Sequence, residues 1–210
     1  MKVTVALILI NTIVFIFTLS GLNYFIESFG FQTIAFLNGE YYRIVTSLFL
    51  HANLLHLGFN MLSLFFLGTS LEKKIDPFRF ILVYFVGGVI GNLGMFLPFF
   101  PPGTIGVGAS GAISALVGLG TFLCPGKLVV FPSILPLPFV VAGAIFFLLT
   151  AMNMFTPQTE IGYQVHMIGL MVGMIFGIIW GKNWLQGLLI FILVVVLIVL
   201  LPIVLSTILL

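Results

Sequence analysis

Charged residues are almost missing from this sequence: only 6% of its 210 residues are Asp, Glu, Lys or Arg, while 61% are hydrophobic. A soluble domain cannot cover its surface with so few charges. Long apolar runs separated by short polar breaks predict a polytopic, all-α membrane protein instead. No tail or linker of distinct composition interrupts the sequence, so we expect a single membrane domain over residues 1–210.

Cysteine is also scarce, since Cys124 is the single one. This count excludes an intramolecular disulfide and the usual thiolate metal sites. The sequence also lacks a basic patch with interleaved aromatic residues, and its net charge is only +2, which argues against a nucleic-acid partner. We therefore expect no metal, no other cofactor and no bound nucleic acid.

Seven apolar ranges are candidates for membrane-spanning helices, and turn-forming residues separate them. The ranges are 3–20, 51–70, 79–98, 110–124, 134–152, 163–181 and 184–209. The first one is similar to a signal peptide, but its apolar run of about 18 residues exceeds the usual core of about 7–15. We therefore interpret it as the first span.

The basic residues indicate how these spans are oriented. If the N-terminus is cytoplasmic, six of the seven basic residues lie inside and only Arg43 lies outside, as the positive-inside rule requires. The six are Lys2, Lys73, Lys74, Arg79, Lys127 and Lys182. We therefore predict a cytoplasmic N-terminus, and the absence of a transit peptide favours a prokaryotic plasma membrane.

The polar side chains of the spans gather in one half of the membrane. His51, His56 and Asn60 open the second span, Ser110 opens the fourth, and His166 opens the sixth. All three spans start at the external face in the predicted topology. Ionisable groups inside a membrane are functional candidates. The two histidines of the second span are five residues apart, a spacing that does not match the His-Glu-x-x-His zinc site.

Small residues line the fourth and sixth spans at helical spacing, which lets two helix backbones approach closely. One stripe is His166, Gly169 and Gly173, and the other is Ser110, Ser114 and Gly118, with Gly111 and Ala115 beside it. If the stripes face each other, Ser110 and His166 come within reach. The histidine can then accept the serine proton and make the hydroxyl nucleophilic. No carboxylate is evident as a third member, so we expect a dyad.

The start of the fourth span also suits the binding of an oxyanion. That span has only about 15 residues, short of the roughly 20 that a full crossing needs, so we expect its first turn to lie below the surface. Gly108 and Gly111 keep Ser110 accessible. The backbone N–H groups of this turn, with His56 and Asn60 as side-chain donors, are candidates for stabilising a developing negative charge.

Three segments together resemble the rhomboid intramembrane serine proteases: "HANLLHLGFNMLSLFFLG", "GASGAISALVG" and "HMIGLMVG". The resemblance implies a six-helix bundle over about 1–182 plus a seventh helix over about 184–209. It also implies a serine endopeptidase that cleaves transmembrane helices of membrane-protein substrates among lipids. Ser110 and His166 would be the catalytic dyad, His56 and Asn60 would bind the oxyanion, and His51 would support them.

Several further positions follow from the same resemblance. Tyr42-Arg43 resembles the Trp-Arg or similar pair in the family's first external loop, and Glu72 resembles its polar contact at a helix end. The fifth span and residues 153–162 are candidates for a gate and a cap at the site, from their position and from the family. Many members carry an aromatic residue four positions after the nucleophile, on which the histidine packs. Here that position is Ser114, whose hydroxyl offers the imidazole a hydrogen bond instead.

Two other functions stay open at this point. A rhomboid-like protein without catalysis would recognise membrane helices, although such proteins usually lack the serine or the histidine. A transporter would use the three histidines as a proton pathway, although the inner half of the spans lacks ionisable relays. The substrate, the cleavage sequence and the oligomeric state do not follow from the sequence.

Overall fold

A long helix occupies each of the seven predicted ranges. The computed structural model describes residues 1–98, 100–101, 103–131, 135–155 and 162–209, the last nine of them by their helix alone. The long helices are α1 (Lys2–Thr18), α5 (Leu54–Leu71), α6 (Pro77–Asn92), α7 (Ser110–Leu123), α8 (Phe139–Asn153), α9 (Tyr163–Trp180) and α10 (Trp184–Leu209). Within the described ranges, the strands are the antiparallel pair β1 (Leu128–Val129) and β2 (Leu137–Pro138). The prediction of an all-α membrane protein is confirmed.

Four helical segments of the described chain are long and apolar enough to cross a membrane: Lys2–Phe29, Leu54–Leu71, Pro77–Phe96 and Tyr163–Trp180. α7 and α8 are apolar but shorter, and the described side chains of α10 cover only its apolar stretch Trp184–Leu200. Seven crossings therefore stay a prediction.

Two predicted helix starts are wrong. The second helix begins at Leu54 rather than at residue 51, because the Asn53 side chain caps it by accepting the backbone N–H of His56. The fifth helix begins at Phe139, directly after β2, whereas the predicted start at residue 134 lies outside the described residues.

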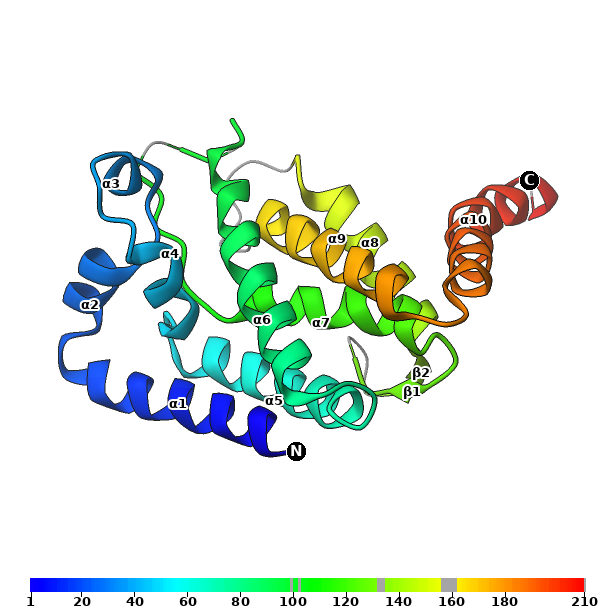
Figure 1. Ribbon diagram of the computed structural model, residues 1–210. Helices are drawn as coiled ribbons and strands as arrows, with labels where there is room; N and C mark the ends of the chain where they lie inside the picture. The colour runs from blue at the N-terminus through cyan, green and yellow to red at the C-terminus, as the bar shows by residue number, and fades with distance from the viewer. Residues whose placement is uncertain (99, 102, 132–134, 156–161, 210) are drawn as a thin grey trace.

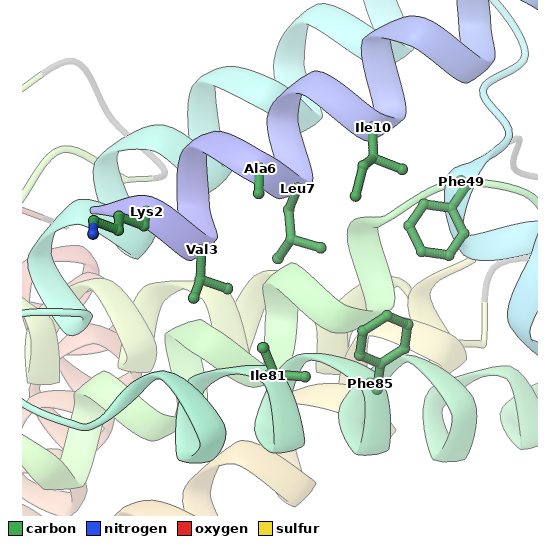
Figure 2. Close-up of a pocket in the computed structure, with 8 residues that line it drawn as sticks. All are labelled: Lys2, Val3, Ala6, Leu7, Ile10, Phe49, Ile81 and Phe85. Atoms are coloured by element: carbon green, nitrogen blue, oxygen red, sulfur yellow. The ribbon is translucent and has the colours of Figure 1, made fainter.

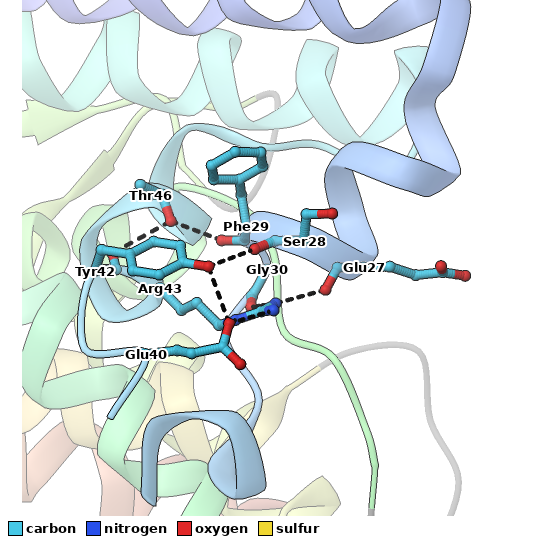
Figure 3. A network of polar contacts seen from close by, with 8 residues as sticks. All are labelled: Glu27, Ser28, Phe29, Gly30, Glu40, Tyr42, Arg43 and Thr46. Atoms are coloured by element: carbon cyan, nitrogen blue, oxygen red, sulfur yellow. Dashed lines mark hydrogen bonds and ion pairs between the residues drawn. The ribbon is translucent and has the colours of Figure 1, made fainter. Parts of the chain in front are cut away.

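Short helices fill the connection between α1 and α5. They are η1 (Leu19–Gly21), α2 (Leu22–Phe29), α3 (Thr33–Leu37), α4 (Arg43–Thr46) and η2 (Ser47–Phe49), and η3 (Leu93–Phe96) similarly extends α6. Hydrogen bonds fold this connection back onto the end of α2 (Figure 3). The buried Arg43 guanidinium donates to the carbonyls of Glu27 and Gly30 and, at 2.7 Å, to the Glu40 carboxylate. Hydrogen bonds from Arg43 and Tyr42 hold the pKa of Glu40 below its ordinary value.

α7 lies in the middle of the bundle, among α5, α6, α8 and α9, while α10 lies at the edge beside α8 (Figure 1). Every residue from Gly111 to Phe122 is buried. The two helices α7 and α9 touch through their backbones, because a Cβ added to Gly173 would overlap the Ala115 carbonyl oxygen. A Cβ at Gly169 would similarly overlap the Gly111 carbonyl oxygen. Glycine is therefore required for this approach.

Glu72, at the end of α5, fastens the first turn of α1. Its carboxylate accepts the backbone N–H of Val3 at 3.0 Å, the backbone N–H of Thr4 at 2.9 Å and the Thr4 hydroxyl. A carboxylate is favourable there because the first N–H groups of a helix have no intrahelical partner. Burial alone would raise the pKa of Glu72, but the hydrogen bonds from Thr4 and Val3 outweigh it, so this pKa lies below its ordinary value.

A groove of about 330 Å³ lies between α1 and α6 (Figure 2). Its lining is apolar apart from one charged side chain and consists of Lys2, Val3, Ala6, Leu7, Ile10, Phe49, Ile81 and Phe85. Ser110, His56 and His166 do not line it. The polar residues that the sequence singles out therefore gather elsewhere.

The glycine contacts between α7 and α9 predict that alanine substitutions at two helical glycines have different effects on the Tm. Gly173→Ala should lower the Tm in detergent, because overpacking a close contact typically costs about 1–3 kcal/mol. Gly58→Ala should leave the Tm unchanged or raise it, because a Cβ at Gly58 meets nothing within 4 Å and alanine is the better helix former. Equal effects of the two substitutions on the Tm would contradict this packing.

The Glu72 contacts predict a pH-dependent stability. A carboxyl with a lowered pKa in the folded state stabilises it above the unfolded pKa of about 4.3, and this contribution is lost as the pH falls through the folded pKa. Glu72→Gln should therefore lower the Tm near neutral pH, and the gap to the wild type should close in acid. Glu27→Gln, which changes an exposed carboxyl, should match the wild type at each pH. A Tm difference between Glu72→Gln and the wild type that stays the same at every pH would refute the role given to the Glu72 carboxylate.

Candidate active site at the start of α7

The loop before α7 is held against the connection between α1 and α5. Gly106 and Phe31 exchange two backbone hydrogen bonds of 2.8 and 2.9 Å, and the N–H of Gly108 donates to the carbonyl of Ser47 at 2.9 Å. Gly108 has a φ of +119°, which few other residues adopt. This fixed loop delivers the chain to Ser110, the first residue of α7. Because its own N–H is engaged, Gly108 contributes space to the site rather than a donor.

Ser110 and His166 meet across the contact between α7 and α9. The hydroxyl oxygen of Ser110 lies 2.8 Å from Nε2 of His166, although 56 residues separate them in the sequence. Both residues are partly buried, and neither is among the fully buried ones. A hydroxyl at this distance from a neutral imidazole can donate its proton to the ring. The two stripes of small residues therefore face each other as the spacing predicted.

His56 lies near Ser110, across Gly108. A Cβ built on Gly108 would lie 2.8 Å from Nε2 of His56 and 3.8 Å from the Ser110 hydroxyl. The backbone N–H of Ala52 reaches Nδ1 of His56 at 3.5 Å, a long hydrogen bond. With Nδ1 as the acceptor, the ring proton resides on Nε2, which then faces the space beside Ser110 as a donor.

His51 and Asn60 lie behind His56. The fully buried His51 ring packs edge-on against His56, with ring centroids 5.2 Å apart. Asn60 is also buried, and its amide donates to the His56 carbonyl at 2.8 Å. His51 therefore packs against the His56 ring, whereas Asn60 is directed to its own helix backbone rather than to Ser110.

The expectation for Ser114 is wrong. Its hydroxyl donates to the carbonyl of Ser110 at 2.7 Å, one turn earlier on α7, and not to the imidazole of His166. Serine in an apolar helix commonly satisfies itself in this way, because the i−4 carbonyl is its nearest acceptor. The His166 ring instead lies near two aromatic rings, Phe146 of α8 at 6.1 Å and Tyr163 of α9 at 6.4 Å.

Sequence reasoning missed Phe146. It lies in the middle of an apolar range in which no polar residue or spacing distinguishes it from its neighbours. The proposed cap, residues 153–162, lies largely outside the described residues. A hydrogen bond links the two flanks of this segment: the amide of Gln164, which follows it, donates to the carbonyl of Met154, near its start. In the described ranges, no group of three or more His, Cys, Asp or Glu residues could hold a metal ion.

Comparison with known proteins places this arrangement in a family. Residues 38–183 match the family model described as the Rhomboid domain. The YdcA protein of Bacillus subtilis (strain 168) is 43% identical over 86 residues, which are 41% of this chain and 43% of YdcA. Rhomboid protease GluP of the same strain is 39% identical over 80 residues, which are 38% of this chain and 15% of GluP.

A third relative carries a different description. Inactive RHOMBOID-like protein 8 of Arabidopsis thaliana is 43% identical over 56 residues, 27% of this chain and 16% of that protein. Each match therefore spans less than half the length of the relative. The family model, in contrast, covers most of this chain and includes both Ser110 and His166. The chain belongs to the rhomboid family.

Proposed function

We propose that this protein is an intramembrane serine endopeptidase that cleaves transmembrane helices of membrane-protein substrates with a Ser110–His166 dyad. The observation that carries the proposal is the 2.8 Å approach of the Ser110 hydroxyl to Nε2 of His166. The close glycine contact between α7 and α9 supports it, because it brings the first turns of the two helices together.

The chemistry is acyl transfer in two steps. Nε2 of His166 takes the Ser110 proton while Oγ attacks the scissile carbonyl, which forms a C–O bond and a tetrahedral oxyanion. The intermediate collapses as the C–N bond breaks, and His166 gives the proton to the leaving amine. Water, activated by the same imidazole, then hydrolyses the acyl ester and restores the Ser110 hydroxyl.

The oxyanion would be stabilised from two directions. The first N–H groups of α7 have no intrahelical partner and carry the positive end of the helix dipole. Nε2 of His56 faces the same space beside Ser110, across Gly108. Donors fixed in this way need no rearrangement when the charge develops.

The membrane setting follows from the charges. We place the N-terminus in the cytoplasm and the dyad in the outer half of a plasma membrane, because that orientation keeps six of seven basic residues inside. We also take residues 1–210 as one domain, with α10 added to a core of about 1–182. A substrate helix hides its carbonyls in its own hydrogen bonds, so we expect cleavage where Gly or Pro lets it unwind.

A second candidate function is recognition of membrane helices without cleavage. The name of one relative, Inactive RHOMBOID-like protein 8, is the observation behind it. In this chain the hydroxyl and the imidazole are both present, in hydrogen-bond contact and partly exposed. This geometry favours catalysis.

The dyad predicts covalent labelling by a fluorophosphonate probe in detergent. The wild type should be labelled, and both Ser110→Ala and His166→Ala should lose at least about 99% of the labelling rate, since removing a triad member costs on the order of 10⁴-fold or more in such enzymes. The readout is gel fluorescence, with the modified residue located by mass spectrometry.

Ser114→Ala is the matched control for this experiment. Ser114 is one turn further along α7 and donates to the helix backbone, so its loss should leave labelling close to the wild-type rate. Labelling that persists in Ser110→Ala would refute the dyad. A wild type that binds membrane helices but does not label would favour recognition without cleavage.

The position of His56 predicts that removing its side chain lowers kcat with little change in KM. His56→Ala should lower kcat for a membrane substrate by roughly 100-fold, the typical effect of removing one oxyanion donor, while KM changes little. His56→Gln, which keeps an N–H donor on a side chain of similar reach, should restore part of the rate. Wild-type kcat in His56→Ala would exclude this role.

A further inference from the structure

The imidazole of His166 has little polar support. Among the described residues, its hydrogen-bond partner is Ser110 and no carboxylate holds the other ring nitrogen. A free imidazole can turn about two side-chain bonds, and each turn moves Nε2 away from the hydroxyl. The orientation of the ring must therefore come from packing.

α7 does not provide that packing. Ser114, one turn below Ser110, is only 1% exposed, and its hydroxyl is bonded to the Ser110 carbonyl. Its Cβ lies 3.4 Å from where a Cβ on Gly169 would be, so this face of α7 lies directly against α9. An aromatic ring at position 114 has no room in this arrangement.

A ring from α8 lies beside the imidazole instead. The Phe146 and His166 ring centroids are 6.1 Å apart, and their planes are inclined by 34°. Tyr163 also contacts His166, at 6.4 Å and 81°, but it belongs to the same helix, three residues earlier, and moves with it. Phe146 is therefore the aromatic neighbour of His166 that belongs to a helix other than α7 and α9.

The helix that carries Phe146, α8, packs closely against α7. A Cβ on Gly143 would overlap the Thr121 hydroxyl, and a Cβ on Gly120 would overlap the Phe139 ring, so α7 and α8 are in close contact at two levels. Phe146 also packs against Phe131, with ring centroids 5.4 Å apart. The Phe146 ring therefore contacts a second aromatic ring besides that of His166.

We propose that Phe146 is a positioning residue that turns the His166 imidazole toward Ser110. The inference rests on the proposed function of the dyad and adds a third helix to the site. Because α8 carries the ring, a displacement of α8 relative to α7 would loosen the base and slow catalysis.

The experiment compares two adjacent phenylalanines of α8. Phe146→Leu should lower the fluorophosphonate labelling rate, and kcat for a membrane substrate, by about 3- to 10-fold, as expected for losing one aromatic pair. KM should not change, and Phe146→Tyr should restore the rate because it keeps the ring. Phe147→Leu is the matched control: Phe147 is also partly buried but packs on Phe191 of α10, at 5.7 Å. It should keep the wild-type kcat.

The outcomes separate this inference from the proposed function. Measuring the Tm of each variant shows whether Phe146→Leu and Phe147→Leu lose similar stability, and Phe146→Met replaces the leucine variant if that one does not fold. Labelling of the wild type at Ser110 with an unchanged rate in Phe146→Leu, or in Phe146→Met where that variant replaces it, would overturn the positioning role alone. Equal losses of kcat in Phe146→Leu and Phe147→Leu would also overturn it. An unlabelled wild type would overturn both proposals.

Discussion

The backbone contact between α7 and α9 is the constraint on which the site depends. Gly169 and Gly173 have no side chain to separate the helices, so the carbonyl oxygens of Gly111 and Ala115 lie where a Cβ would otherwise be. The contact brings Ser110 and His166, at the first turns of their helices, to 2.8 Å. In a membrane, where apolar side chains gain nothing by leaving lipid, close packing and interhelical hydrogen bonds are the forces that hold helices together.

The remaining parts of the molecule secure this contact from outside. The connection between α1 and α5 pairs with the loop before α7 through Phe31 and Gly106, and it is itself held by Arg43. At the other end of the bundle, Glu72 fastens α1 to α5. Polar groups are few in this chain, and those at the helix ends and in the connecting loops do much of this work. The interior of the bundle is packed mainly with glycine, aliphatic and aromatic residues, such as the fully buried Phe80, Tyr84 and Phe139.

The sequence predicted the helices well because a long apolar run is a strong signal. It predicted the meeting of Ser110 and His166 because two independent regularities, the spacing of small residues and the distribution of basic residues, pointed to the same end of the bundle. The start of α5 was misplaced because Asn53 caps the helix three residues into the predicted range. Phe146 could not be predicted, because contacts between distant aromatic residues leave no periodic pattern. The hydroxyl of Ser114 was assigned to the wrong partner because the backbone of its own helix competes for it.

The central claim is that Ser110 and His166 break a peptide bond within the membrane. The most direct measurement reconstitutes the purified chain in liposomes with a single-spanning protein whose transmembrane segment contains Gly and Pro, and identifies the products by mass spectrometry. The account predicts a cut inside that segment, near the end that faces the external side of the enzyme, and no cut when Ser110 is replaced by alanine. An intact substrate with the wild type, or the same cut with Ser110→Ala, would contradict it.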